Sequence, residues 1–339
     1  MKRRRVNTAG NSLRSAKRGL LSCGLALLLL AGTATAAVQQ YPTRPIRFIV
    51  GFPAGGLADL MARSLGQKLT EAWGQQVIVD NRAGGSGMLS MQIVANAPRD
   101  GYTLLLGSST QFSINPALRS VPYDPIREYT PVIKAAQNPL MLTVHPSFAA
   151  KSVQELIQLA KAKPANIMSY GSSGYGAAPH IAAELLKKLA GINMTHVPYK
   201  GGNDAVIALL GGHIQMNFGA PSTALPHVKA GRLRALGVTG TQRLAAAPDV
   251  PTFAESGLRG FNVDQWFGVF MPSGVPRALV IKLNEELARA LASPQFREQF
   301  TTQGVELTSS TPESFAAFVN EELVLWKRVL KGLGIQDAP

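Results

Sequence analysis

The sequence predicts an α/β protein with two lobes and a cleft between them. Apolar runs typical of buried strands alternate with helical runs, and this βαβ rhythm favours parallel sheets with right-handed crossovers. The rhythm occurs twice along the chain, and segments that resemble the first unit flank the second. Glycine-rich loops follow several strands, and open α/β sheets bind ligands outside the carboxyl ends of their strands. We therefore expect a binding site in the cleft.

The first unit opens with the apolar run IRFIVGF at 46–52, which predicts a buried strand. This run ends in Pro-Ala-Gly-Gly, and the stretch that follows has apolar residues at helical spacing. A strand at 75–81, a glycine-opened helix at 84–97, and a strand with a polar loop at 100–110 continue the unit. These elements form the βαβαβ pattern of a parallel sheet.

A strand at 138–146 and a helix at 152–164 open the second unit, with Ser152 as the N-cap and Pro164 as the stop. Strands, glycine-rich loops and helices then alternate over 167–191, 194–212, 213–221 and 232–240. The chain closes with a proline-rich connector at 247–261, a last strand at 265–274, and two long amphipathic helices near 276–292 and 312–332. No repeat with a period of about 20–50 residues is present, which excludes a solenoid.

Residues 1–36 have the pattern of a secretory signal. A basic, acid-free stretch precedes the apolar run at 20–32, and Ala-Thr-Ala at 34–36 offers a cleavage site. Removal of this segment lowers the formal net charge from +14 to +7, because 27 of the 34 Lys and Arg residues remain, together with all 20 Asp and Glu residues. No basic stripe with interleaved aromatic residues remains, so we do not expect a nucleic-acid partner. Cys23 is the only cysteine and lies inside the segment, which excludes disulfides, Cys-ligated metals and Cys nucleophiles from the mature chain.

Two glycine-rich loops stand where strands lead into helices. The first few N–H groups of a helix lack intrahelical partners and carry roughly half a positive charge. Gly55-Gly56 therefore predicts one small anion cradle, and residues 171–176 (GSSGYG) predict a second that adds two hydroxyl donors. Two cradles on two lobes suit a small carboxylate held between them. Asp59 is expected to cap the first helix.

Enzyme interpretations have less support. The sequence has no G-x-S-x-G, no P-loop and no complete G-x-G-x-x-G, so we expect no catalytic residues and no cofactor. His180 and Glu184 lie one helical turn apart, but no third ligand is evident and we expect no metal. A serine hydrolase that uses Ser172 or Ser173 with His180 is the alternative from another functional class.

Eight segments, in order from Tyr41 to the C-terminus, resemble the Bug family, the periplasmic solute receptors of tripartite tricarboxylate transporters. They are YPTRPIRFIVGFPAGGLADLMAR, VDNRAGGSGM, DGYTLLLGSS, SYGSSGYGAAPHIAAELL, HVPYKGG, ALPHVKAGRLRALGVT, PDVPTFAESGL and, from Trp266, W.GVFMPSGVP. The resemblance implies a type II-like periplasmic binding-protein fold that closes on a small organic acid. It assigns 1–36 to a cleaved signal peptide, 37–137 with 256–339 to one lobe, and 138–255 to the other.

The resemblance also implies which residues hold the ligand, because family receptors bind a carboxylate with main-chain amides, hydroxyls and bridging waters. On the first lobe these positions are Phe52, Ala54, Gly55, Gly56, Asp59, Ser108 and Ser109. On the second lobe they are Ser172, Ser173, Gly176, His180, Tyr199, Lys200, Gly201, Phe218 and Gly219. Trp266 is expected to pack near the hinge or in the core, and we expect Phe52, Phe112 and Tyr175 to line the cleft.

Two positions depart from the family pattern. Many relatives have Asp where Gly219 stands, so the resemblance favours a ligand without an amino group. Leu57-Ala58 replaces the usual Pro-Thr or Pro-Ser, which removes one hydroxyl donor. The expected function is capture of a small organic acid by a monomeric periplasmic receptor, which closes by hinge bending and docks on transporter membrane subunits. A receptor that feeds a signalling system is the alternative among binding proteins.

Overall fold

A computed structural model of the chain describes residues 41–162 and 168–334. The predicted signal segment and the predicted stop at Pro164 lie outside the described residues. Residues 44–339 form one compact unit, and the fold below is that of this unit. In the described part of the chain, no helix has the length and apolar character needed to cross a membrane.

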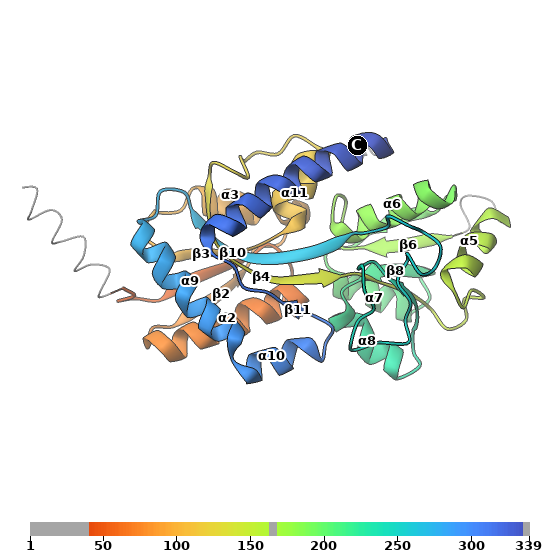
Figure 1. Cartoon of the computed structure of the whole chain (residues 1–339), viewed down its shortest axis with the longest axis horizontal. Helices are drawn as coiled ribbons and strands as arrows, with labels where there is room; N and C mark the ends of the chain where they lie inside the picture. The colour runs from red at the N-terminus through yellow and green to blue at the C-terminus, as the bar shows by residue number, and fades with distance from the viewer. Residues whose placement is uncertain (1–40, 163–167, 335–339) are drawn as a thin grey trace, which may run out of the picture. The chain divides into compact units, whose positions relative to one another are not determined.

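Lobe 1 is built on a six-stranded sheet with the order β11-β4-β10-β3-β1-β2 (Figure 1). Its strands are β1 (Ile46–Val50), β2 (Val77–Asn81), β3 (Thr103–Ser108), β4 (Tyr129–Pro139), β10 (Asp264–Pro272) and β11 (Glu306–Leu307). The helices of this lobe are α2 (Leu57–Trp73), η1 (Gly85–Gly87), α3 (Met88–Ala95), η2 (Thr110–Ile114), α4 (Asn115–Leu118), α9 (Arg277–Ala292), α10 (Pro294–Thr301) and α11 (Pro312–Leu333). As the βαβαβ pattern predicts, β1 pairs in parallel with both β2 and β3.

Lobe 2 is built on a five-stranded sheet with the order β7-β6-β8-β5-β9. Its strands are β5 (Met141–Val144), β6 (Ser169–Ser172), β7 (Thr195–Pro198), β8 (Met216–Gly219) and β9 (Arg234–Val238). Its helices are α5 (Val153–Ala162), α6 (Ala178–Ala190), α7 (Gly202–Leu210) and α8 (Pro221–Lys229). The predicted cap of α5 is present, since Ser152 Oγ accepts a hydrogen bond from Glu155 N at 3.1 Å.

The two-lobed α/β fold is confirmed, but both sheets are mixed rather than mainly parallel. In lobe 1, β10 pairs antiparallel with β3 and β4, and β11 pairs antiparallel with β4. In lobe 2, β5 pairs antiparallel with β8 and β9. The reason is the double crossing between lobes: β4 runs toward lobe 2 and β10 returns from it. The lobe boundaries proposed from the sequence, at 137/138 and 255/256, stay a prediction.

The long strand β4 has a weak sequence signal, and the sequence predicted a strand only from 138 onward. Its polar residues Lys134, Gln137 and Asn138 interrupt the apolar run that marks a buried strand. Two of them face polar partners: Lys134 Nζ donates to Gln137 Oε1 at 2.7 Å, and Gln137 Nε2 donates to Asp264 Oδ2 at 2.8 Å. The stretch between the two last long helices, left unassigned from the sequence, forms α10 and then β11.

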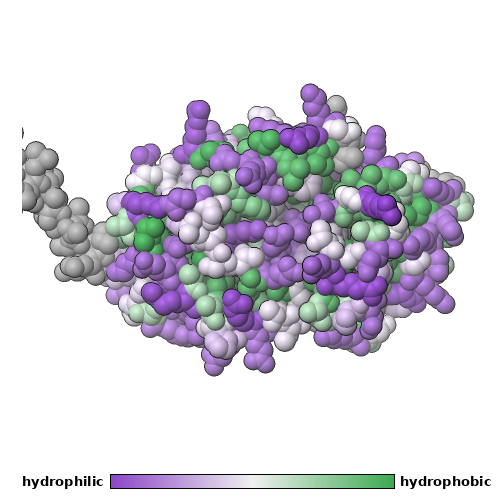
Figure 2. Space-filling view, viewed as in Figure 1, coloured by the Kyte–Doolittle hydropathy of each residue, from purple (hydrophilic) through white to green (hydrophobic). Residues whose placement is uncertain are grey.

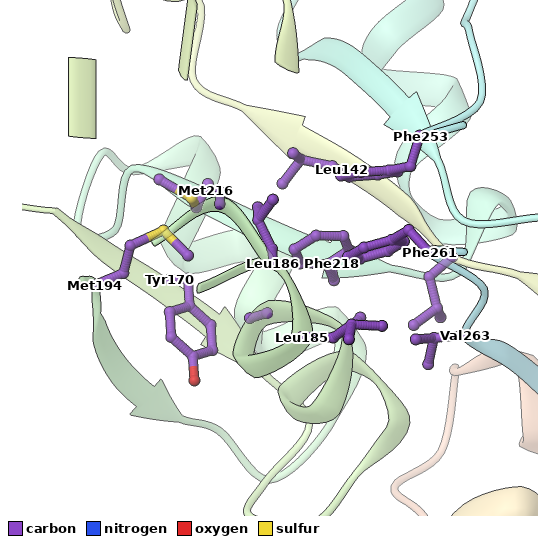
Figure 3. Packing of buried hydrophobic residues seen from close by; sticks show 14 of the residues in the cluster. Leu142, Tyr170, Leu185, Leu186, Met194, Met216, Phe218, Phe253, Phe261 and Val263 are labelled. Carbon is purple, nitrogen blue, oxygen red and sulfur yellow. The ribbon is translucent and has the colours of Figure 1, made fainter. Parts of the chain in front are cut away.

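Each lobe has its own apolar core. The lobe 2 cluster includes Leu142, Met216 and Phe218, which come from neighbouring strands (Figure 3). Phe253 and Phe261 stack on this cluster with ring centroids 4.1 Å apart. Burial of each such side chain stabilises the fold by about 1.5–3 kcal/mol. The lobe 1 cluster is centred on Phe112, which stacks on Phe270 at 3.9 Å. Phe112 is therefore a core residue and does not line the cleft, contrary to expectation.

Helix α11 packs on both lobes. Its Phe315 and Val319 belong to the lobe 1 core, whereas Trp326 and Leu330 belong to the lobe 2 core. The space-filling view shows apolar residues gathered over this helix, where Val324 and Leu325 are exposed (Figure 2). Trp266 lies on the crossing strand β10, buried in the lobe 1 core, and its Nε1 donates to Glu322 Oε2 of α11 at 3.2 Å.

Thr239 joins the two segments that cross between the lobes. Its hydroxyl accepts a hydrogen bond from Leu140 N and donates one to Val263 O, both at 2.8 Å. Its N–H donates to Leu140 O at 2.9 Å. Because Leu140 follows β4 and Val263 precedes β10, this single buried side chain links the outgoing and returning segments.

We predict that Thr239→Val lowers the free energy of unfolding by about 1–3 kcal/mol, because the isosteric change leaves the Leu140 N–H and the Val263 carbonyl without a partner. Urea denaturation followed by tryptophan fluorescence measures this loss. Thr239→Ser keeps the hydroxyl and serves as the control. Equal stability of the Val variant and the wild type would show that the hydroxyl does not hold the crossing together.

Candidate functional site

The loop between β1 and α2 places three backbone amides at the edge of the cleft. Gly55 has a φ of +83°, a left-handed conformation that favours glycine. Gly56 is the N-cap of α2, and the first amide with an intrahelical acceptor is that of Leu60, 3.0 Å from Gly56 O. The amides of Gly56, Leu57 and Ala58 therefore precede the helical hydrogen-bond ladder.

The buried side chain of Asp59 stabilises the loop between β1 and α2. Its Oδ2 accepts hydrogen bonds from Gly55 N at 2.9 Å and from Arg63 Nε at 3.0 Å. Burial opposes ionisation of this carboxyl, but the hydrogen bonds from Arg63, Gly55 and Asn81 outweigh burial and hold the pKa of Asp59 below its usual value. The N–H of Gly55 thus faces Asp59, and the cradle expected at Gly55-Gly56 starts one residue later.

The starts of four helices surround one cavity, which we call the inner cavity. Its wall includes Gly56–Ala58 of α2, Pro179 of α6, Gly201–Asp204 of α7, and Ala220 and Thr223 of α8. The N-cap residues of these helices are Gly56, Ala177, Gly201 and Ala220, and none has a side-chain capping hydrogen bond. Each helix start presents roughly half a positive charge, so the four together favour an anion. At the start of α6 the first amide, Ala178 N, already donates to Thr110 Oγ1, and Pro179 has no N–H, so α6 acts mainly through its dipole.

No arginine, lysine or histidine occurs among the described residues that line the inner cavity. Its only charged wall residue is Asp204, which is exposed. The volume of about 90 Å³ is smaller than the roughly 150 Å³ cavity that holds a benzene molecule. The cavity therefore fits a carboxylate with a short chain, held by backbone dipoles and neutral side chains.

The GSSGYG loop, which follows from β6, contributes to the wall of the inner cavity. Ser173 lines the inner cavity, whereas Ser172 is buried behind it, with its Oγ 2.7 Å from His196 Nε2. The imidazole of His196 stacks on Tyr170 and His180, at centroid distances of 4.9 and 4.3 Å. Burial lowers the pKa of His196 to about 3, and His180 and Lys187 add to this effect, so His196 is neutral. The neutral His196 ring thus supports the GSSGYG loop through its contact with Ser172 Oγ on the side away from the cavity.

A larger space, which we call the outer chamber, adjoins the inner cavity. Its volume is about 540 Å³, and it shares Phe52, Pro53 and Ser173 with the inner cavity. Tyr175, Tyr199 and Lys200 contribute to its wall from lobe 2, and residues 83–87 from lobe 1. A ligand that exceeds the inner cavity has room to extend past Phe52 into this chamber.

The lobes touch across the cleft at several points. Asn203 Nδ2 donates to Gly55 O at 2.9 Å, Ser86 Oγ donates to Tyr175 O at 2.6 Å, and Ala178 N donates to Thr110 Oγ1 at 3.3 Å. A Cβ on Gly176 would stand 2.5 Å from Asn115 Oδ1, and the φ of +71° at Gly176 also favours glycine. Gly176 therefore lets the second loop approach lobe 1 closely.

The structure brings part of the predicted set together. Phe52, Ala54, Gly56, Ser173, Gly201 and Gly219 line the inner cavity, and Tyr199 and Lys200 line the outer chamber. The remaining predicted residues lie outside both walls: Gly55, Asp59, Ser108, Ser109, Ser172, Gly176, His180 and Phe218. Ser108 Oγ donates to Gln111 Oε1 at 3.0 Å inside lobe 1. A direct role of these residues in binding stays a prediction.

Several residues of the inner cavity were not singled out from the sequence, among them Asn203, Thr223, Gln265 and Phe267. Gln265 and Phe267 alternate along β10, so a period-two reading of that strand was the available signal. The His180–Glu184 pair serves other contacts, because His180 Nδ1 accepts from Gly176 N and Glu184 Oε1 accepts from Tyr170 Oη. Among the described residues, no group of three His, Cys, Asp or Glu side chains is placed to hold a metal ion.

The two lobes and the cleft between them define a periplasmic binding protein. Residues 61–335 match the family described as the tripartite tricarboxylate transporter family receptor, TctC, and the chain belongs to this family. It is 37% identical over 309 residues to a protein encoded in the tcbD-tcbE intergenic region of Pseudomonas sp. strain P51, covering 91% of this chain and 92% of that protein. It is 34% identical over 322 residues to the protein BugT of Bordetella pertussis, covering 94% and 98%. The resemblance to the Bug family is confirmed.

Two solved structures are similar over the whole fold. Rpa4515 of R. palustris with adipate has a TM-score of 0.84 and 34% identity, covering 87% of this chain and 99% of that chain. MatC of Rhodopseudomonas palustris with bound malate has a TM-score of 0.82 and 30% identity, covering 86% and 100%. The family and these structural neighbours are binding proteins.

We predict that Asp59→Asn destabilises the protein by roughly 1–2 kcal/mol at neutral pH, because hydrogen bonds to an ionised carboxylate are replaced by neutral ones. Since the folded pKa of Asp59 lies below the unfolded value of about 3.9, its contribution exists above that pH and is lost as pH falls through the folded pKa. Urea denaturation at pH 7 and between pH 4.5 and 2.5 measures both effects.

The exposed Asp249, changed to Asn, is the matched control for this experiment. We expect a smaller acid dependence only in the Asp59 variant. If the free energy of unfolding of the Asp59 variant fell with pH as steeply as that of the wild type, ionised Asp59 would not stabilise this loop.

Proposed function

We propose that the mature chain is a periplasmic receptor that captures a small carboxylate in the inner cavity and presents it to the membrane subunits of a tripartite tricarboxylate transporter. The observation on which this rests is the meeting of four uncapped helix starts at a cavity without a basic side chain among its described wall residues. The family and the acids bound by two structural neighbours, adipate and malate, support the same class of ligand.

The contacts between lobes suggest how capture works. Residues 56–58 belong to lobe 1, and Ser173, Gly201 and Asn203 belong to lobe 2, so a carboxylate that bridges them favours the closed arrangement. A ligand shifts the population of a state only through its preference for that state. Donors that converge only after closure supply this preference, and the membrane subunits then distinguish the closed receptor from the open one.

Export to the periplasm and action as a monomer complete the proposal. The basic and apolar pattern of residues 1–36 supports export, with cleavage after Ala36. An inner cavity whose wall comes from both lobes of one chain supports a receptor that works without a second copy.

We predict that the mature chain, refolded to remove carried-over ligand, gains about 2.7 kcal/mol of stability from a carboxylate present at about 100 times its dissociation constant. Thermal unfolding against a panel of mono- and dicarboxylates, each beside the amide in which every carboxylate is replaced by a carboxamide, tests this. Carboxylates should stabilise the protein and the carboxamides should not, because the helix starts favour negative charge. A refolded protein that responds to no carboxylate would overturn the proposal.

Ser173→Ala should weaken binding of the best acid by roughly 10–100-fold, the loss expected for one hydrogen bond to a charged group. Isothermal titration measures the change. Ser309→Ala is the control, because Ser309 is exposed on the loop before α11. Unchanged affinity in the Ser173 variant would place the carboxylate elsewhere.

A further inference from the structure

Ser86, in the turn between β2 and α3, adopts a backbone conformation that side chains disfavour. Its φ is +53° and its ψ is +39°, and among the described residues it is the only one other than glycine with a positive φ. Its neighbours Gly84, Gly85 and Gly87 share the sign of φ. On conformational grounds alone, glycine would therefore suit position 86 best. A side chain kept there against this preference indicates that its hydroxyl has a role.

The hydroxyl of Ser86 reaches across the cleft. Ser86 Oγ donates a hydrogen bond to Tyr175 O of the GSSGYG loop at 2.6 Å, and both residues line the outer chamber. A Cβ on Gly174 would stand 2.9 Å from Ser86 Oγ, so the loop has no side chain where the hydroxyl approaches it. A turn of lobe 1 thus holds the loop of lobe 2 that places Ser173 in the wall of the inner cavity.

The turn around Ser86 is itself anchored in lobe 1. Asn115 Nδ2 donates to Ser86 O at 3.2 Å. The next carbonyl, Gly87 O, accepts hydrogen bonds from Ser90 Oγ at 2.7 Å and from Gln111 Nε2 at 3.3 Å. These contacts lie within lobe 1, so they do not depend on where lobe 2 stands. The hydrogen bond of Ser86 Oγ, by contrast, requires that the lobes meet.

The other glycine-rich loop is held in the reciprocal way. Asn203 Nδ2, from α7 of lobe 2, donates to Gly55 O at 2.9 Å, next to Gly56 in the wall of the inner cavity. Each loop therefore has one backbone carbonyl bound by a side chain from the opposite lobe. Asn203 also lines the inner cavity, whereas Ser86 lines only the outer chamber of the two. A change at Ser86 thus tests the contact between the lobes without altering the wall of the inner cavity.

We propose that Ser86 is a positioning residue that binds the GSSGYG loop to lobe 1 and thereby favours the closed arrangement, in which Ser173 and Gly56 share one cavity wall. In an open arrangement Ser86 Oγ and Tyr175 O both face water, so the hydrogen bond contributes only its net free energy. One neutral hydrogen bond changes an equilibrium by roughly 2–10-fold. The consequence for ligand capture rests on the proposed function, whereas the contact between the lobes does not.

The amide of Ala178 measures lobe closure without any ligand. It donates to Thr110 Oγ1 of lobe 1 at 3.3 Å, and as the first residue of α6 it has no acceptor within the helix. Its hydrogen exchange therefore follows the opening of the cleft. In two-dimensional NMR of the mature chain, Ser86→Ala and Ser86→Gly should each speed this exchange by roughly 2–10-fold. The amide of Ile181, which donates to Ala177 O within lobe 2 at 3.1 Å, should keep its rate.

The two variants separate the role of the hydroxyl from that of the turn conformation. Ser86→Gly removes the hydroxyl and relieves the strained φ, whereas Ser86→Ala removes the hydroxyl and keeps the strain. A residue that only shapes the turn would give faster exchange with Ala and no increase with Gly. A residue that binds the opposite lobe should give the same increase with both. Ser309→Ala, on an exposed loop of lobe 1, is the matched control and should leave the exchange of Ala178 unchanged.

Three results of the exchange experiment would overturn the proposal. They are an Ala178 amide that exchanges in the wild type as fast as an unstructured amide, equal exchange in the wild type and both Ser86 variants, and an increase confined to Ser86→Ala. None of these results depends on a ligand.

Binding of acids supplies a second readout. Adipate, malate and the other acids of the carboxylate panel are titrated into the wild type and both Ser86 variants by isothermal calorimetry. An acid that binds the wild type should bind both variants roughly 2–10-fold more weakly. Unchanged affinity beside faster exchange would overturn the positioning role. A panel in which no acid binds would overturn the receptor function, and hydrogen exchange would still decide the role of Ser86.

Discussion

The architecture depends on helix starts that the chain leaves uncapped. Gly56, Ala177, Gly201 and Ala220 hold the N-cap positions of the four helices around the inner cavity, and neither Gly nor Ala supplies a side-chain oxygen to the first amides. Thr311 of α11, by contrast, accepts a hydrogen bond from Ser314 N. In the proposed function, a carboxylate between the lobes accepts hydrogen bonds from amides that no N-cap side chain engages.

Backbone recognition also explains how a receptor binds an acid without a basic residue in the inner cavity. A buried ion pair requires that two charges lose their hydration, and its attraction often only offsets that cost. Helix amides are already fixed in direction, so they stabilise an anion with little rearrangement. In the proposed function the carboxylate head is held in this sequence-independent way, and wall residues such as Thr223, Gln265 and Phe267 meet the rest of the ligand.

Hydrophobic periodicity and glycine positions predicted the strands and loops whose structure depends on residues close together in the sequence. The runs at 46–52 and 75–81 became parallel strands β1 and β2, and the glycine loops reached the cleft as expected. Local patterns do not contain the return of the chain between the lobes, which makes both sheets mixed. Nor do they show that the polar residues of β4 pair with one another and with Asp264 of β10.

The site was predicted in outline for the same reason. Ser173 follows β6 directly and Gly56 begins α2, so their positions could be predicted from the sequence. Asn203 and Gln265 meet the cavity only through the packing of the lobes. The sequence also could not show that Gly55 N–H is already taken by Asp59, because that contact depends on the backbone turn at Gly55.

Helix α11 spans the two lobes and packs on the core of each. Phe315 and Val319 anchor one end in lobe 1, and Trp326 and Leu330 anchor the other in lobe 2. Any opening must either bend this helix or slide its second half over the lobe 2 core, and exposed apolar surface costs about 25 cal/mol per Å². Opening of the cleft is therefore coupled to the packing of the C-terminal helix on both lobe cores.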